Sequence, residues 1–483
     1  MSIQTAMEFA CGNWKNREVI AQAVDQDLSS DAGLTLFGQF DTKLGWTHQF
    51  SSLIKDTRSD PKHSIKSIVQ QRVYGILAGY EDQNDHDILR SDPVFKMLAG
   101  RNPSDKDLAS QPTISRLENM VQPSELLQLE QWFIEKFVES FENPPAEITL
   151  DIDTYADAAH GTQQLALWHD YYKQNQYQVR VISCAENDMI VFPVLLFGSA
   201  AVKLGAAEDL RRVIEALRER FPNVAIHVRA DSGFGGPDVY DMLESFANLT
   251  FTIALKINER TKKLSETLLE QAIAAQANTG ESQVRYLPIV GYQCRFWKNA
   301  IRNLLIKCEV TASSTSRRIL VSNRPELPDN PELVYRQYAE RGESENRNKE
   351  LKCGLSGDRL SDHRYMANLF RIMMHCMSHN MLVLLRRLVA VDEPTLIAKQ
   401  DPLVPNKPLK ETKAERKVHN DRRKRDPLGE GHPCTWRMHV IKVAARILVS
   451  ARRVVIQLSA SWPHLKYFQQ VAAAIERFRP LTQ

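Results

Sequence analysis

The chain has 483 residues, 43% of them apolar, and a formal net charge of +3. Its length suits two to four domains with sizeable cores. The small net charge excludes a protein that binds nucleic acid through its overall charge, so any such signal must be local.

Cysteine usage and hydropathy narrow the class of protein further. The seven cysteines are widely spaced, odd in number and without a Cys-x-x-Cys pair, which argues against a disulfide framework and a structural zinc site. No charged-then-apolar leader opens the chain, and arginine, histidine and asparagine interrupt the most apolar run, residues 366–391. We therefore expect a protein of the reducing cytosol, with a buried helix at this run and no membrane span.

Residues 1–145 are expected to form a mainly helical N-terminal region. Apolar residues recur with helical spacing in residues 65–80 and again in residues 124–141. Both stretches are therefore predicted to be amphipathic helices.

Between these helices lies a candidate DNA-reading element. Pro112 breaks the pattern, and Thr113, Ser115 and Arg116 would open a new helix with short polar side chains and a cation. This arrangement resembles a helix-turn-helix, so the three residues are candidate DNA contacts. The alternative is an ordinary capped helix, whose start has the same composition.

From Glu147 onward the period of the pattern changes to two. Aliphatic residues alternate with polar ones, so a strand would bury the aliphatic face and turn Asp151 and Asp153 together to the other face. Two carboxylates on one strand face are costly unless a cation neutralises them. Further strands are expected at residues 178–184, 189–197 and 224–228, with an amphipathic helix at residues 210–221 before the last of them.

A third acid, Asp231, follows the last of these strands in a glycine-rich turn. An aspartate at this position is held by rigid scaffold yet exposed at the edge of the sheet. The glycines at 233, 235 and 236 fit neither the P-loop nor the dinucleotide-binding spacing, so we interpret them as turn residues.

Residues 249–323 again favour strands. Within them, Trp297 stands beside Arg295 and Lys298, an aromatic and cationic mixture suited to stacking an unpaired base. The alternative is packing of the aromatic residues within the sheet.

The stretch of residues 338–352 carries a patterned set of polar side chains. On one continuous helix, Tyr338, Arg341, Glu345 and Lys352 would fall within an arc of roughly 60°. Such a face suits holding a phosphate backbone against a metal-bound carboxylate, because cations neutralise phosphate and the acid supplies a hard oxygen ligand. The alternative is a solvated helix face with ordinary ion pairs.

The C-terminal part is locally basic. Residues 399–425 hold ten lysines or arginines against four acids, which indicates a solvated linker that could also contact DNA phosphates. A final apolar and basic block, residues 441–458, is expected to pack back onto the body.

Together these features resemble the DDE transposases of bacterial insertion sequences, in the branch with the Tyr-Arg-Glu-Lys helical signature, and are most similar to the insertion sequence 1380 family. The resemblance covers nearly the whole chain. It rests on residues 79–87, 110–119, 151–153 with 160–161, 229–234, 338–352, and 450–453 with 461–463. One departure is that residues 197–205 lack the arginine-proline-glycine-asparagine turn found in many members.

The resemblance implies an α/β fold with an RNase H-like catalytic core, a mixed five-stranded sheet with helices, interrupted by a β-rich insertion domain. The domains implied are a helical DNA-binding region, the first part of the core, the insertion domain, the second part of the core with the glutamate-bearing helix, and a basic linker with the C-terminal region. Their ranges are 1–145, 146–248, 249–330, 331–391 and 392–483.

For the site, the resemblance implies that Asp153, Asp231 and Glu345 are the catalytic metal ligands. Asp151 is a rival for the first position; Asp153 is favoured because a threonine follows it, as is common in the family. The ions implied are two Mg²⁺, with Mn²⁺ able to substitute. Four side chains of the signature stretch would grip the phosphates of the DNA: Tyr338, Arg341, Lys349 and Lys352.

The activity implied is cut-and-paste transposition. The protein would bind the terminal inverted repeats of its own element as double-stranded DNA, cleave and transfer strands, and act as a homodimer in the bacterial cytoplasm at the nucleoid. One alternative is a sequence-specific DNA-binding protein that no longer cleaves. Another is a different enzyme with paired carboxylates, such as a glycosidase, which would give the cations of residues 338–352 no role.

Overall fold

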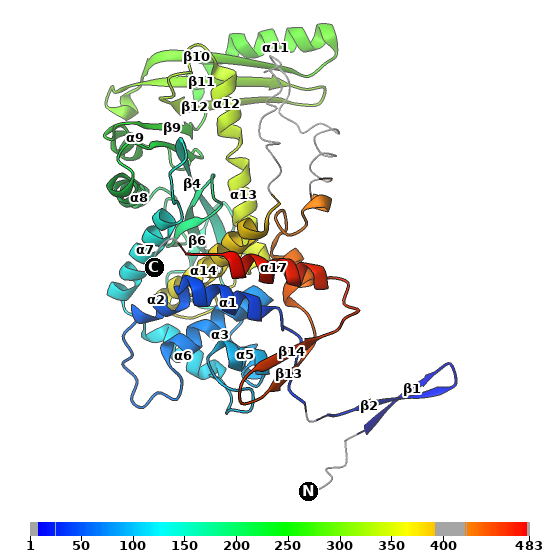
Figure 1. The fold of residues 1–483 in the computed structure, drawn as a ribbon. Coiled ribbons are helices and arrows are strands. Elements are labelled where there is room, and N and C mark those ends of the chain that lie inside the picture. Colours follow the sequence, from blue (N-terminus) through cyan, green and yellow to red (C-terminus); the bar gives the residue numbers. More distant parts are fainter. Residues whose placement is uncertain (1–7, 25, 392–420, 422, 481–483) are drawn as a thin grey trace.

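The period-two stretch that begins at Glu147 forms the central strand of the protein, β4 (Glu147–Ala158), as the alternation predicts. The computed structural model describes residues 8–24, 26–391, 421 and 423–480. It is a mixed α/β structure in which helices surround one large sheet (Figure 1).

Five strands of this sheet lie in the order β7–β6–β4–β8–β9. Strands β4, β6 and β7 are antiparallel neighbours, whereas β4, β8 and β9 run parallel. Parallel neighbours require crossovers, and helices α8 and α9 supply them. The bounds are β6 (Gln174–Cys184), β7 (Ile190–Phe197), α8 (Ala206–Arg220), β8 (Ala225–Ala230), α9 (Pro237–Glu244) and β9 (Leu249–Ala254), with the short β5 (Leu167–His169) beside β6.

The β-rich stretch that follows is continuous with this sheet. Strand β12 pairs antiparallel with β9, and β11 and β10 extend the sheet outward, with α11 packed on them (Figure 1). Strand β9 therefore belongs to the same sheet as β4. The bounds are α10 (Glu259–Leu264), α11 (Glu266–Thr279), β10 (Gln283–Gln293), η1 (Arg295–Trp297), β11 (Ile301–Val310) and β12 (Thr315–Ser322).

Helices of the N-terminal region pack around one long helix, α14 (Tyr365–Val389), which contacts α3, α6, α7 and β7. Most side chains of α14 are buried, as its sequence predicts. None of the helices in the described ranges has the length and apolarity to cross a bilayer. The N-terminal helices are α1 (Leu34–Leu44), α2 (Trp46–Ser52), α3 (Ile65–Ala78), α4 (His86–Leu89), α5 (Pro93–Leu98), α6 (Gln111–Met120) and α7 (Pro123–Glu139).

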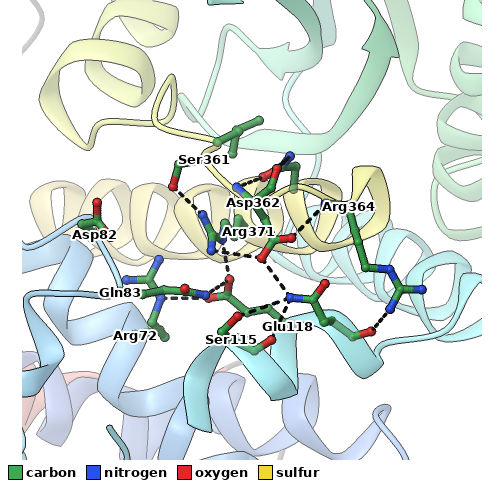
Figure 2. A network of polar contacts seen from close by, with 12 residues as sticks. Arg72, Asp82, Gln83, Ser115, Glu118, Ser361, Asp362, Arg364 and Arg371 are labelled. Carbon is green, nitrogen blue, oxygen red and sulfur yellow. Dashed lines mark hydrogen bonds and ion pairs between the residues drawn. The ribbon is translucent and has the colours of Figure 1, made fainter. Parts of the chain in front are cut away.

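A buried network of polar side chains joins α6 to α14 (Figure 2). Glu118 of α6 receives Arg72 of α3 with Nε 3.1 Å from Oε1, and it is also paired with Arg371 of α14. Arg371 in turn donates to Ser361 Oγ at 2.9 Å and lies 3.4 Å from Asp362 Oδ2. The network fixes α6 against the core helix and against the loop that precedes it.

Strand β3 and helix α1 meet the C-terminal elements of the chain. Strand β3 pairs with β13, and Lys43 of α1 donates to three backbone carbonyls at the end of α17. Residues 441–458 pack onto the body as expected, with Ala445 and Ile447 buried. The remaining elements there are β3 (Leu28–Ser29), α16 (Pro433–Trp436), η3 (Arg437–Ile441), β13 (Ala445–Val449), β14 (Val454–Leu458) and α17 (Leu465–Arg477).

A hairpin near the N-terminus was not predicted. Strands β1 (Glu8–Trp14) and β2 (Arg17–Gln22) are exposed along their whole length, and Figure 1 shows them projecting from the body. Most of the basic segment, residues 399–425, lies outside the described residues.

The prediction of one continuous helix over residues 338–352 is wrong. The stretch contains the end of α12 (Pro331–Ala339), then α13 (Gly342–Lys349), then a π-helical turn, η2 (Glu350–Gly354). The junction has a physical cause, because Gly342 is a poor helix former and the Arg341 N–H donates to Tyr338 O, three residues back, at 3.0 Å.

Candidate active site

Two of the predicted acids are brought together by the register of the sheet. Ile152 of β4 lies opposite Ala230 of the parallel strand β8, and this is the last pair of the two strands. The residues that follow, Asp153 and Asp231, therefore lie side by side where the pairing ends. The backbone N–H of Thr154 donates to Asp153 Oδ1 at 2.9 Å. The backbone N–H of Gly233 donates to Asp231 Oδ1 at 2.7 Å, so the glycine-rich turn holds the second carboxylate.

Helix α13 brings the third acid to the same place. Asn348 Nδ2 donates to Asp153 Oδ2 at 3.1 Å. Arg341 Nη1 lies 3.5 Å from Asp153 Oδ2, and its Nη2 lies 3.4 Å from Glu345 Oε1. One guanidinium therefore bridges the acid of β4 and the acid of α13.

The electrostatics at Asp153 show that the three acids share one environment. Burial raises the pKa of Asp153 to about 6, and the negative charges of Asp231 and Glu345 raise it as well. Arg341 and the N–H of Thr154 act in the opposite direction and lower this pKa. The three acids therefore have too little positive charge around them. A cation bound between them would relieve the repulsion among their negative charges.

The rival residue Asp151 is engaged elsewhere. Arg229 of β8 donates to both of its carboxylate oxygens, from Nε at 2.7 Å and from Nη2 at 2.8 Å, and both side chains are almost fully buried. Arg229 also donates to Gln337 O at 2.6 Å, so this pair ties β4 and β8 to α12.

We expect Asp151→Ala to cost about 3–5 kcal/mol in the free energy of unfolding, because the buried Arg229 guanidinium loses its two-point carboxylate partner and keeps only the exposed Glu340, 3.5 Å from Nη1. Urea unfolding followed by circular dichroism measures this loss. Asp151→Ala combined with Arg229→Met should recover much of it, since the buried positive charge is then also removed. A stability equal to that of the unsubstituted protein for Asp151→Ala alone would show that the pair is not structural.

The predicted phosphate contacts of residues 338–352 do not share one face. Tyr338 is 3% exposed and packs in a small apolar cluster with Tyr335. Lys352 lies in the π-helical turn, where its Nζ donates to Ala156 O at 3.0 Å and stands over the ring of Tyr155. Lys349 is exposed.

The other candidate DNA contacts lie on other elements, η1 and its flank and α6. Trp297 is 2% exposed and packs against Tyr240 and Tyr292, whereas Arg295 and Lys298 are exposed. The residues predicted to read DNA from a helix-turn-helix lie on α6. Arg116 is exposed, and Thr113 and Ser115 are half-buried.

Sequence reasoning missed Asn348. Its amide contacts Asp153 directly, and its position three residues after Glu345 is a signal that could have found it, because residues three apart lie on one helix face.

The three acids suit a hard divalent cation, since their donors are carboxylate oxygens and few positive charges lie near them. In the described ranges, however, no three acidic, histidine or cysteine side chains are arranged to hold an ion between them. Arg341 occupies the position of the counter-charge between Asp153 and Glu345.

A match to a protein family identifies the class of protein to which this fold and these acids belong. The sequence model of the family described as "Transposase DDE domain group 1" matches residues 12–401. The chain therefore belongs to the DDE-domain transposases, and within them to group 1.

Comparison with solved structures finds similar chains, one of which is a transposase. A piggyBac transposase in a synaptic complex with hairpin DNA is similar at 13% identity, with a TM-score of 0.41, over 74% of this chain and 77% of that chain. No curated protein matches the chain.

Proposed function

We propose that this protein is the transposase of an insertion sequence, that it binds the terminal inverted repeats of its element, and that it cleaves and transfers DNA strands with Asp153, Asp231 and Glu345 as its catalytic acids. The observation that carries the proposal is the register of β4 and β8, which pairs the two aspartates beside the helix that bears Glu345. We also propose that it belongs to the insertion sequence 1380 branch.

The strand order supports an RNase H-like core. Three antiparallel strands followed by two parallel ones, in the order β7–β6–β4–β8–β9, leave both aspartates at the carboxyl ends of adjacent parallel segments. We propose the domain ranges given above for this core, its insertion and the flanking regions, with β9 as the strand that joins core to insertion.

Asp153, Asp231 and Glu345 would hold two Mg²⁺ ions, or Mn²⁺ in their place, and the bound ions would supply Lewis-acid chemistry for phosphodiester cleavage. Asn348 would orient the Asp153 carboxylate through its hydrogen bond. Arg341 would exchange its contacts with the acids for contact with a phosphate. Tyr338 would act indirectly, because Arg341 stands over its ring at 5.9 Å.

Exposed or half-buried cationic side chains would bind the duplex on either side of the acids. We propose Lys349 and Lys352 near the site, Arg295 and Lys298 on η1 and its flank, and Arg116 with Thr113 and Ser115 on α6 as phosphate or base contacts. Trp297 is buried, so we leave it out of this set. We propose a homodimer when two ends are paired, acting in the bacterial cytoplasm.

Cation binding should depend on pH because Asp153 must be ionised to act as a ligand. Its folded pKa of about 6 lies above the ordinary value near 4, so the folded state holds the extra proton between those values. Without a cation, the contribution of this group to stability is therefore lost as the pH rises through that window. We expect the affinity for Mn²⁺ to fall about tenfold for each pH unit below 6.

Isothermal titration calorimetry with Mn²⁺ at pH 5, 6 and 7.5 tests this dependence. Asp153→Asn is the control, because its affinity should be low and independent of pH over this range. Equal affinities of the unsubstituted protein at pH 5 and 7.5 would contradict the role given to Asp153.

The proposed function is tested by incubating the protein with a supercoiled plasmid that carries the DNA flanking its gene on both sides. We expect strand cleavage at the borders of the element with Mg²⁺ or Mn²⁺, and none with EDTA. Tight binding of this DNA without cleavage under any metal condition would instead support the alternative, a transposase-derived DNA-binding protein that no longer cuts.

A further inference from the structure

Helix α13 cannot hold its own position through apolar packing. Its eight residues, GESENRNK, include no apolar side chain. A helix of this length is also unstable in isolation, because its nucleation cost is spread over few hydrogen bonds. The location of Glu345 therefore depends on polar contacts, among them that of Asn348 with Asp153, and on how the following turn η2 is held, where Leu351 is buried.

The strongest of these contacts converge on Glu350, the first residue of η2. Its side chain is 7% exposed. Arg386 Nη1 of α14 donates to Oε1 at 2.8 Å, and His432 Nδ1 is 2.7 Å from the same oxygen. An ionised carboxylate only accepts hydrogen bonds, so His432 donates from Nδ1. His379 Nε2 of α14 lies 3.6 Å from Oε2.

These partners keep Glu350 ionised although it is buried. Burial by itself raises the pKa of Glu350, but the imidazoles of His379 and His432 and the guanidinium of Arg386 hold it well below its ordinary value. The charge of Glu350 is thus part of the folded arrangement.

Besides the contacts of Glu350, which form a first anchor of α13, the pair of Arg347 with Asp188 forms a second. Arg386 contacts both. Arg347 of α13 donates from Nε to Asp188 Oδ1 at 2.7 Å, in the turn between β6 and β7. Arg386 Nη2 lies 3.8 Å from Asp188 Oδ2, so Arg386 faces both anchors. The chain beyond residue 420 contributes through His432 and through Gly431 O, which accepts from Arg386 at 3.3 Å.

We propose that Glu350 and His432 are positioning residues for Glu345, and that they fix α13 at the edge of the sheet through Arg386 and the Asp188 anchor. The inference rests on the proposed function only for the role of Glu345 as a catalytic acid. It gives the C-terminal region a part in building the site: the chain that follows residues 392–420 holds the helix that precedes them.

Amide hydrogen exchange tests the positioning directly and needs no cleavage activity. We expect His432→Ala to speed exchange of the backbone amides of residues 342–352 by about tenfold or more, with little change in peptides from α3 and α7. His432→Asn should restore slow exchange, because the Asn Nδ2–H₂ stands where Nδ1–H stands in histidine and can donate to Glu350. His48→Ala, at an exposed histidine of α2, is the matched control.

Cleavage of the flanking-DNA plasmid supplies the second arm. At saturating Mn²⁺ we expect His432→Ala to lower kcat about tenfold while the Kd for the flanking DNA changes less than twofold, and His432→Asn to recover the rate. Glu350→Gln should have the larger effect, because it removes the charge that faces Arg386; a Tm measurement checks that it folds.

Hydrogen exchange and DNA cleavage test the positioning inference and the proposed function separately. Unchanged exchange over residues 342–352 in both His432→Ala and Glu350→Gln overturns the positioning inference, as does a His432→Asn protein as impaired as His432→Ala. Absence of metal-dependent cleavage by the unsubstituted protein overturns the proposed function instead, and the exchange arm then still decides whether these residues hold α13.

Discussion

Asp153→Asn is expected to reduce metal-dependent cleavage of the flanking DNA by at least about 10³-fold, which corresponds to roughly 4 kcal/mol of transition-state stabilisation. The amide keeps the shape of the side chain and loses the charge that a divalent cation needs. The protein should fold at least as stably as before, because the raised pKa of Asp153 shows that its negative charge is unfavourable in the folded state.

The matched control lies on the same strand. Asp157, four residues further along β4, is buried, and burial and then the charge of Asp358 raise its pKa to about 8. It is therefore mostly protonated at pH 7, and Asp157→Asn replaces a neutral group by another of the same shape. We expect this variant to cleave within about threefold of the unsubstituted rate. Equal losses in Asp153→Asn and Asp157→Asn would mean that β4 responds to any substitution, and the catalytic assignment would fall.

Glu118→Ala is expected to cost about 3–5 kcal/mol in the free energy of unfolding. Its side chain is 1% exposed and is paired with Arg72 and Arg371, both buried, so its removal takes the ion-pair partner of Arg72 away and leaves Arg371 with the more distant Asp362, 3.4 Å from its Nη2 (Figure 2). Gln83 also donates to this carboxylate. The loss should be visible as a lower urea midpoint.

Glu135→Ala on the exposed face of α7 is the control, and should change stability by no more than about 0.5 kcal/mol. If Glu118→Ala were equally neutral, the network in Figure 2 would not be what fixes α6 against α14. Any DNA contacts made by Arg116 on α6 would then need another explanation for their position.

Local pattern was sufficient to predict the elements that carry the two aspartates. Alternation from Glu147 defines β4, and the aliphatic run before Asp231 defines β8. Alternation could not separate Asp151 from Asp153, because both point to one face. The two aspartates differ because Arg229 on the neighbouring strand pairs with Asp151. The sequence of neither strand predicts the register between residues 78 positions apart.

Local pattern failed where tertiary contacts decide the backbone. Helical spacing placed Tyr338 and Lys352 on one face, but the helix breaks just before Gly342 and widens into a π-helical turn at Glu350. Burial of Glu350 among residues of α14 and the C-terminal region accompanies that turn. Trp297 is a similar case, since only its packing partners Tyr240 and Tyr292 show that it is a core residue.

The exposed hairpin of β1 and β2 was missed because both of its faces meet solvent, so no alternation marks it. Strands β13 and β14 were read only as an apolar and basic block, although its packing against the body was expected.

We propose that Asp153, Asp231 and Glu345 form one cation site where the parallel pairing of β4 and β8 ends. Crystals of the protein with a duplex from the flanking DNA, soaked in Mn²⁺, test it through the anomalous signal of the metal. We expect a peak bounded by these three side chains, with carboxylate oxygens at about 2.1 Å and Arg341 displaced from Glu345. Mn²⁺ bound elsewhere, with Arg341 still bridging Asp153 and Glu345, would contradict it.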